Sequence, residues 1–133
     1  MKDINRISNK ERSYVNEVLD SQFETSSGNK MNTRLEKAFA KLYGTKYAIT
    51  FVNGTATMHT VLLAVGIGKG DEVIVPPLTM ASTTFAVLQV GATPIYADVD
   101  PQTFQIDPSS IKEKISKKTK AIITVALYGL SPD

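Results

Sequence analysis

Short apolar runs alternate with helical stretches from Lys46 to the end of the chain, and this alternation constrains the fold more than any other feature of the sequence. We predict strands at Tyr47–Val52, Glu72–Val75, Pro94–Val99 and Ala121–Ala126, and helices between them at Thr55–Val65, Ala81–Val90 and Ser109–Ile115. None of these strands has a polar face, which is typical of a mainly parallel sheet covered on both sides by helices. The alternation therefore predicts a three-layer α/β/α architecture.

Two amphipathic helices are expected before this region. The first covers Asn9–Ser21, where apolar residues fall on one helical face. The second carries a capping-box pattern at its start, with Thr33 followed three residues later by Glu36. Its apolar stripe continues to Gly44, the residue type expected just past a helix end. Near the end of the chain, Asp107 and Pro108 are placed as the cap and first residue of another helix.

Length and composition limit the class of protein. The 133 residues suffice for one globular domain, which we expect to span 1–133. Apolar residues make up 42% and charged residues 21%, the usage of an ordinary soluble protein. Cysteine is absent, which excludes disulfides, zinc–thiolate sites and thiol nucleophiles and fits a cytoplasmic protein. The amino-terminal residues are charged throughout, unlike a secretory signal, and no stretch is apolar enough to span a membrane.

Charge patterning disfavours nucleic-acid binding. The net charge is +2. The lysines are spread along the chain except for one cluster, and they form no basic stripe with interleaved aromatic residues. That cluster is formed by Lys112, Lys114, Lys117, Lys118 and Lys120. We interpret it as the solvated carboxyl-terminal end of a helix, where the helix dipole favours cations.

The most informative local motif is Asn53-Gly54-Thr55-Ala56, between a predicted strand and a predicted helix. Glycine permits a tight turn, and free backbone amides at a helix start, together with the Thr55 hydroxyl, form an anion site suited to a phosphate. The alternative is that Asn-Gly is only a turn and Thr55 only a helix cap. The motif has neither the spacing of a Walker loop nor that of a dinucleotide-binding fold.

Other polar residues allow a functional and a structural interpretation. His59 is the one histidine, and its apolar neighbours on a helix favour a structural role over a general base. Thr79 and Thr83 follow the second predicted strand, where ligand contacts occur in α/β sheets, although capping roles stay open. Asp98 and Asp100 suggest a strand-ending turn more than a carboxylate pair or a metal site. We therefore predict no metal site.

The order of several separate motifs resembles one family. They are the phosphate turn, Gly-Asp-Glu-Val-Ile-Val-Pro, Gly-Ala-Thr-Pro, Ala-Asp-Val-Asp and Leu-Tyr-Gly. In this order they resemble the large domain of the DegT/DnrJ/EryC1/StrS aminotransferases, fold-type-I pyridoxal-phosphate enzymes that aminate keto-sugars carried on nucleotides. The resemblance runs from about Gly28 to the last residue.

The resemblance implies a set of cofactor-binding residues. It assigns the phosphate of pyridoxal 5'-phosphate to Gly54, Thr55 and Ala56. Met80 falls where the family usually has an aromatic residue that stacks on the pyridine ring, a contact that a polarizable thioether also makes. With Thr83 added from its place after the second strand, these five residues are the predicted cofactor site.

The resemblance also implies the reaction. The expected enzyme transfers an amino group from an amino acid to a nucleotide-linked keto-sugar, and we expect glutamate as the amino-acid donor. The expected mechanism is ping-pong, and the expected assembly is a homodimer. The Schiff-base lysine and the acid that binds the pyridinium are expected beyond residue 133. We therefore assign no catalytic role to any residue present. We expect the chain to be an amino-terminal fragment that is inactive alone. The alternatives are a sugar dehydratase of the same fold and a non-catalytic regulatory or phosphate-binding module.

Overall fold

The computed structural model describes residues 6–21 and 30–132 and divides the chain into two compact units, Met1–Thr50 and Phe51–Asp133. The expectation of a single domain stays a prediction. Within the described ranges, no helix combines the length and apolar character needed to cross a membrane.

The first unit contains two helices, α1 (Asn9–Asp20) and α2 (Lys30–Tyr43). A capping box between Ser8 and Glu11 begins α1, and Gly44, with a φ of +65°, follows the end of α2 as predicted. The capping box predicted at Thr33 is wrong, because α2 already begins at Lys30. The Glu36 carboxylate instead accepts hydrogen bonds from the Thr50 amide and hydroxyl, both at 2.9 Å. It therefore stabilises the segment after α2 rather than the start of the helix.

The second unit contains the sheet. Its elements are α3 (Gly54–Ala64), β1 (Glu72–Val75), α4 (Ser82–Gln89), β2 (Thr93–Tyr96), α5 (Pro108–Lys114), β3 (Thr119–Ile122) and the 3₁₀ turn η1 (Leu127–Gly129). The strand order is β2-β1-β3, and β1 pairs in parallel with both neighbours. The central strand is thus β1, with Ile74 opposite Ile95 on one side and Ile122 on the other.

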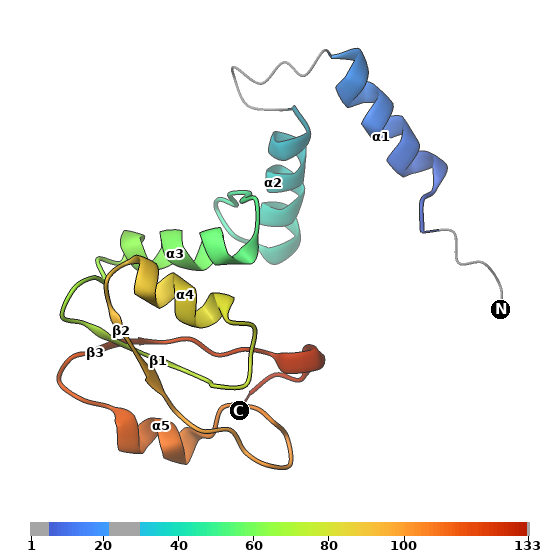
Figure 1. Cartoon of the computed structure of the whole chain (residues 1–133). Helices are drawn as coiled ribbons and strands as arrows, with labels where there is room; N and C mark the ends of the chain where they lie inside the picture. Colours follow the sequence, from blue (N-terminus) through green and yellow to red (C-terminus); the bar gives the residue numbers. More distant parts are fainter. Residues whose placement is uncertain (1–5, 22–29, 133) are drawn as a thin grey trace. The chain divides into compact units, whose positions relative to one another are not determined.

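The core lies on both faces of β1. Val73, Ile74 and Val75 are all 0% exposed. Val73 and Val75 belong to a cluster with residues of α3 and α4, whereas Ile74 belongs to a second cluster that includes Ile111 of α5. Figure 1 shows α3 and α4 on one side of the sheet and α5 on the other. The predicted three-layer α/β/α architecture with a parallel sheet is confirmed.

The strand boundaries differ from the predicted ones. Tyr47–Val52 is not a strand, since the sheet is formed by three strands from the second unit. β2 ends at Tyr96, and Val99 forms an isolated antiparallel bridge with Ile106 outside the sheet. β3 begins at Thr119 and ends at Ile122, after which the chain leaves the sheet towards η1. In the described part of the chain, three of the four predicted strands are thus present with shifted or confirmed ends, and the fourth is absent.

Two carboxylates organise the connection from β2 to α5. Asp100 accepts hydrogen bonds from the amides of Gln102 (2.9 Å) and Thr103 (2.8 Å), which confirms the predicted turn. Asp107 caps α5 through the Ser109 amide at 2.8 Å, and Pro108 is the first helical residue, both as predicted. The Ser109 hydroxyl and amide are the main cause of the lowered pKa of Asp107.

The two-sided burial of β1 predicts a large stability loss on truncation of Ile74. We expect Ile74→Ala to lower the free energy of unfolding by about 2–5 kcal/mol, because the cavity forms in the sheet's centre. Ile115→Ala is the matched control, since Ile115 is 55% exposed, and its cost is expected within about 0.5 kcal/mol. Urea unfolding monitored by circular dichroism measures both. Equal losses in the two variants would contradict the assignment of the core.

The cap of α5 predicts an acid-sensitive contribution to stability. A carboxyl whose pKa is lowered on folding stabilises the fold above its ordinary pKa, and this contribution is lost as the pH falls through the lowered value. Asp107→Asn keeps a capping oxygen but does not titrate. We expect the wild type to lose more stability than Asp107→Asn between about pH 5 and pH 2, measured as urea midpoints across that range. Parallel pH profiles would show that Asp107 contributes no pH dependence.

Candidate functional site

The start of α3 is built by Asn53. Its extended backbone (φ −164°, ψ 170°) turns the chain into the helix, and its Oδ1 atom accepts a hydrogen bond from the Ala56 amide at 2.9 Å. The Asn53 carbonyl accepts from the Thr57 amide at 3.2 Å. The alternative of a helix cap therefore applies to Asn53, not to Thr55.

Two amides at this helix start remain for a ligand. Among the described residues, neither the Gly54 nor the Thr55 amide has a protein acceptor. Gly54 is exposed, Thr55 is half-buried, and a Cβ atom added at Gly54 would meet no atom within 4 Å. The approach to the helix start is open, and the helix dipole favours an anion there. The Ala56 amide is already occupied by Asn53, so it differs from the other two.

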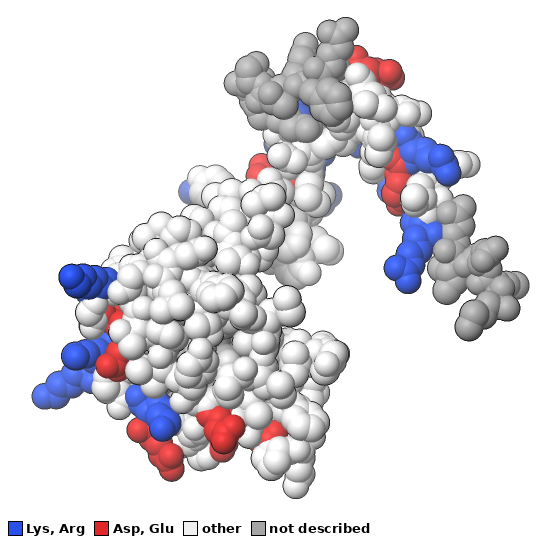
Figure 2. All heavy atoms as spheres, in the orientation of Figure 1, with Lys and Arg blue, Asp and Glu red and all other residues white. Residues whose placement is uncertain are grey.

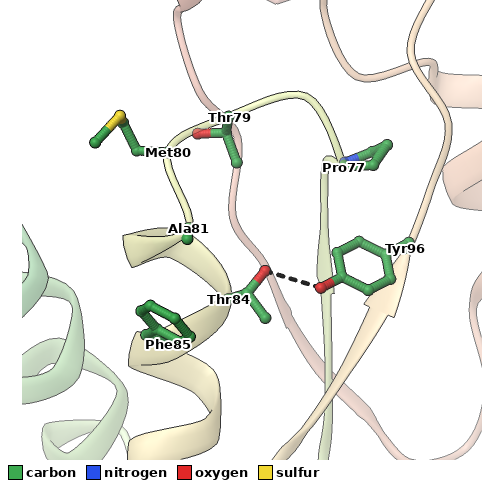
Figure 3. Close-up of a pocket in the computed structure, with 7 residues that line it drawn as sticks. All are labelled: Pro77, Thr79, Met80, Ala81, Thr84, Phe85 and Tyr96. Carbon is green, nitrogen blue, oxygen red and sulfur yellow. Dashed lines mark hydrogen bonds between the residues drawn. The ribbon is translucent and has the colours of Figure 1, made fainter.

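Met80 lies on the loop that leads from β1 to α4. It lines a pocket of about 370 Å³ and is 77% exposed. The pocket is lined by Pro77, Thr79, Met80, Ala81, Thr84, Phe85 and Tyr96 (Figure 3). Gly54, Thr55 and Ala56 do not line it. The predicted cofactor residues thus lie on the start of α3, on the loop from β1 to α4 and in the first turn of α4.

Thr83 is enclosed rather than open to a ligand. Its side chain is 2% exposed, and its hydroxyl lies 3.3 Å from that of Thr79. Its amide donates to the Met80 carbonyl at 3.2 Å. These contacts join the first turn of α4 to the loop that carries Met80. The capping alternative for Thr79 and Thr83 is wrong, because Ala81 occupies the N-cap position of α4 and no side chain of the described residues caps this helix.

Two pocket residues were not predicted from the sequence. The Thr84 and Tyr96 hydroxyls lie 3.1 Å apart and point toward one another from α4 and β2 (Figure 3). Tyr96 is the last residue of β2, and the carboxyl ends of parallel strands are where ligands bind in open α/β sheets. That position was the available signal for Tyr96. Thr84 had no separate signal, because its pairing depends on how α4 packs beside β2.

The remaining polar candidates are spread over the chain. His59 is half-buried in the middle of α3, and Asp98 lies beside the turn that Asp100 caps. The part of the chain that the structure describes has no group of three or more histidine, cysteine or acidic residues able to hold a metal ion. The lysine cluster is exposed, but only Lys112 and Lys114 belong to the last turn of α5, and Lys120 lies in β3.

The turn after β3 is hydrogen-bonded to the side chain of Gln105, a buried residue that is 5% exposed. With its amide nitrogen turned toward the carbonyls, Gln105 donates to Val125 at 2.8 Å and to Leu130 at 3.0 Å. Between them, Tyr128 has a φ of 53° and is 99% exposed. This turn and the Met80 loop follow neighbouring strands, β3 and β1, on either side of the point where the strand order reverses.

Charged side chains are unevenly distributed over the second unit. In Figure 2 the surface over α3 and α4 is uncharged, whereas the Lys, Arg, Asp and Glu side chains of this unit gather below and to the left. Large apolar side chains are exposed on these two helices, among them Val61, Leu63, Phe85 and Leu88. An anion at the start of α3 would therefore be held by backbone amides and the helix dipole.

Comparisons with known proteins identify a family that the chain matches. Residues 5–133 match the DegT/DnrJ/EryC1/StrS aminotransferase family. The chain is 48% identical over 123 residues to GDP-perosamine synthase of Escherichia coli O157:H7, covering 92% of this chain and 34% of that protein. It is 45% identical over 124 residues to GDP-perosamine synthase of Caulobacter vibrioides, covering 93% and 33%.

Two solved structures extend the comparison. The aminotransferase from Psychrobacter cryohalolentis matches with a TM-score of 0.88 and 37% identity over 96% of this chain and 32% of that one. NtdA from Bacillus subtilis, solved with bound cofactor PMP, matches with a TM-score of 0.84 and 37% identity over 96% and 30%. The chain thus spans about a third of the length of the relatives that it matches.

Proposed function

We propose that this chain, which belongs to the DegT/DnrJ/EryC1/StrS aminotransferase family, contributes the phosphate-binding part of a pyridoxal-phosphate-dependent enzyme that aminates a nucleotide-linked keto-sugar. The observation that carries the proposal is the start of α3, where the Gly54 and Thr55 amides have no acceptor among the described residues. The similarity to GDP-perosamine synthases supports a sugar nucleotide as the substrate. We further propose glutamate as the amino donor, a homodimer as the assembly and the cytoplasm as the location.

The residues at the start of α3 fit the phosphate of the cofactor. The Gly54 and Thr55 amides and the Thr55 hydroxyl would hold its oxygens, and the dipole of α3 would favour its charge. The Ala56 amide is already bonded to Asn53 and would not bind the phosphate directly. Ala56 would contribute to the phosphate site only as part of the first turn of α3. When bound, the cofactor supplies an amino-group carrier and an electron sink.

The loop after β1 would orient the cofactor ring. Met80 is exposed on this loop, and its thioether would lie against the ring face. The Thr79–Thr83 hydroxyl contact and the bond from the Thr83 amide to the Met80 carbonyl hold the loop against α4. We therefore propose that Thr83 serves cofactor binding by positioning Met80.

The anion site predicts a specific effect of charge at position 53. Asp caps a helix as well as Asn does, so Asn53→Asp should keep α3 folded. Its carboxylate would stand beside the free amides and repel phosphate, and we expect the dissociation constant for inorganic phosphate to rise about tenfold or more. Asn53→Ser, a neutral cap, is the matched control. The measurement is an NMR titration that follows the Gly54 and Thr55 amides; if phosphate leaves both amides unshifted in the wild type, the proposed site is wrong.

The ring contact predicts the effect of changing Met80. Met80→Tyr offers a larger stacking surface and should leave the affinity for pyridoxal phosphate unchanged or raise it. Met80→Ala removes the contact and should weaken binding by about two- to tenfold. Equilibrium titrations followed by cofactor absorbance measure both. A tenfold or greater loss of affinity in Met80→Tyr would count against a stacking position for this residue.

A further inference from the structure

Several residues that line the pocket beside Met80 have no role in the proposed phosphate site or ring contact. Pro77, Met80 and Phe85 give it apolar surface, and Phe85 is 55% exposed. Thr79, Thr84 and Tyr96 give it three hydroxyl groups from a loop, a helix and a strand. Such a mixed lining suits a ligand that has both C–H and O–H groups.

The Thr84–Tyr96 pair is the main polar feature of this pocket. The two hydroxyl oxygens lie 3.1 Å apart, close enough for one to donate to the other. One hydroxyl proton and several lone pairs then remain for a ligand. A ligand hydroxyl is also both donor and acceptor, so it would match either arrangement of the pair. Tyr96 is 48% exposed and lines the pocket.

The lining also limits the charge of the ligand. Of the residues that the structure describes, no lysine, arginine, aspartate or glutamate lines this pocket. A neighbouring pocket shares Pro77 and Tyr96 but is lined as well by Asp98, Glu113 and Lys114. A phosphate or carboxylate would find no charged partner in the first pocket, whereas a neutral polyhydroxyl ring would need none. Its volume of about 370 Å³ falls in the ordinary range for small-molecule sites.

We propose that this pocket binds the pyranose ring of the sugar substrate, with the Thr84–Tyr96 pair bonding a ring hydroxyl and Phe85 and Pro77 contacting its C–H face. The proposal rests on the proposed function, because it names the part of the chain that takes the substrate of that enzyme. Thr84 and Tyr96 would then be specificity-determining residues, since a hydroxyl pair favours a ligand that can bond to it over one that cannot.

The test uses two ring compounds that differ in their hydroxyls. Methyl α-D-mannopyranoside is the sugar probe, and 2-methoxytetrahydropyran presents a similar ring without hydroxyl groups. Both are titrated into the purified protein, and the amides of residues 79–85 and 96 are followed by NMR. We expect the sugar to shift these amides in a saturable manner and the hydroxyl-free ring to bind at least fivefold more weakly.

Conservative variants separate the hydroxyl pair from the rest of the pocket. Tyr96→Phe and Thr84→Val each remove one hydroxyl at nearly constant volume and should weaken sugar binding about fivefold. The double variant should bind the sugar about as tightly as the weaker-binding single variant, because the two hydroxyls act as a pair and their effects do not add. Tyr128→Phe is the control, since it removes a phenolic hydroxyl from an exposed residue outside the pocket.

Inorganic phosphate titrated into the same samples distinguishes this proposal from the proposed function. If phosphate shifts the Gly54 and Thr55 amides but the sugar shifts none of the pocket amides, the pyranose site is overturned and the phosphate site stands. If the sugar binds in the pocket and phosphate does not bind at α3, the pyranose site is supported and the phosphate site is wrong. Equal sugar affinity in the wild type and in Tyr96→Phe would overturn the role of the hydroxyl pair.

Discussion

The parallel pairing of β1 with strands on both of its sides is the constraint on which the rest of the second unit depends. Because β1 is central, both faces of Val73–Val75 need cover, and two apolar clusters form instead of one. The connection through α4 covers one face, and the connection through α5 covers the other. The same pairing brings the ends of β1 and β3 together, so the loops after them share one edge of the sheet.

The ligand contacts that we propose rely on backbone groups and neutral side chains more than on formal charge. The start of α3 presents amides, the loop after β1 presents a thioether, and the pocket beside it presents hydroxyls. None of the carboxylates with lowered pKa values, such as Asp100 and Asp107, lines the pocket beside Met80. Their hydrogen bonds instead shape the connection from β2 to α5, which indicates that charge here serves turns and caps.

The sequence was a good guide wherever the signal is local. The apolar run Glu72–Val75, the cap Asp107 with Pro108, and Gly44 after α2 each follow from neighbouring residues and were predicted correctly. The errors arose where a distant residue decides the outcome. Glu36 bonds to Thr50, fourteen positions away, and so does not cap a helix at Thr33.

The candidate site divides in the same way. The turn into a helix at Asn53 was visible in the sequence, although the described residues before it do not form the predicted strand. The selection of Asn53, not Thr55, as the cap depends on backbone geometry. The family resemblance pointed to Met80, whereas the Thr84–Tyr96 pair depends on the packing of α4 beside β2. Local patterns therefore identify where a site begins, and tertiary packing selects which side chains complete it.

The buried amide of Gln105 has a consequence for motion within the second unit. It lies in the connection from β2 to α5 and bonds to carbonyls on both sides of Tyr128, those of Val125 and Leu130, which follow Gln105 by 20 and 25 residues. These bonds therefore couple the connection from β2 to α5 to the turn after β3. The backbone of Tyr128 is already restrained before any contact forms, so a group that meets its ring would lose less conformational entropy than on a free loop.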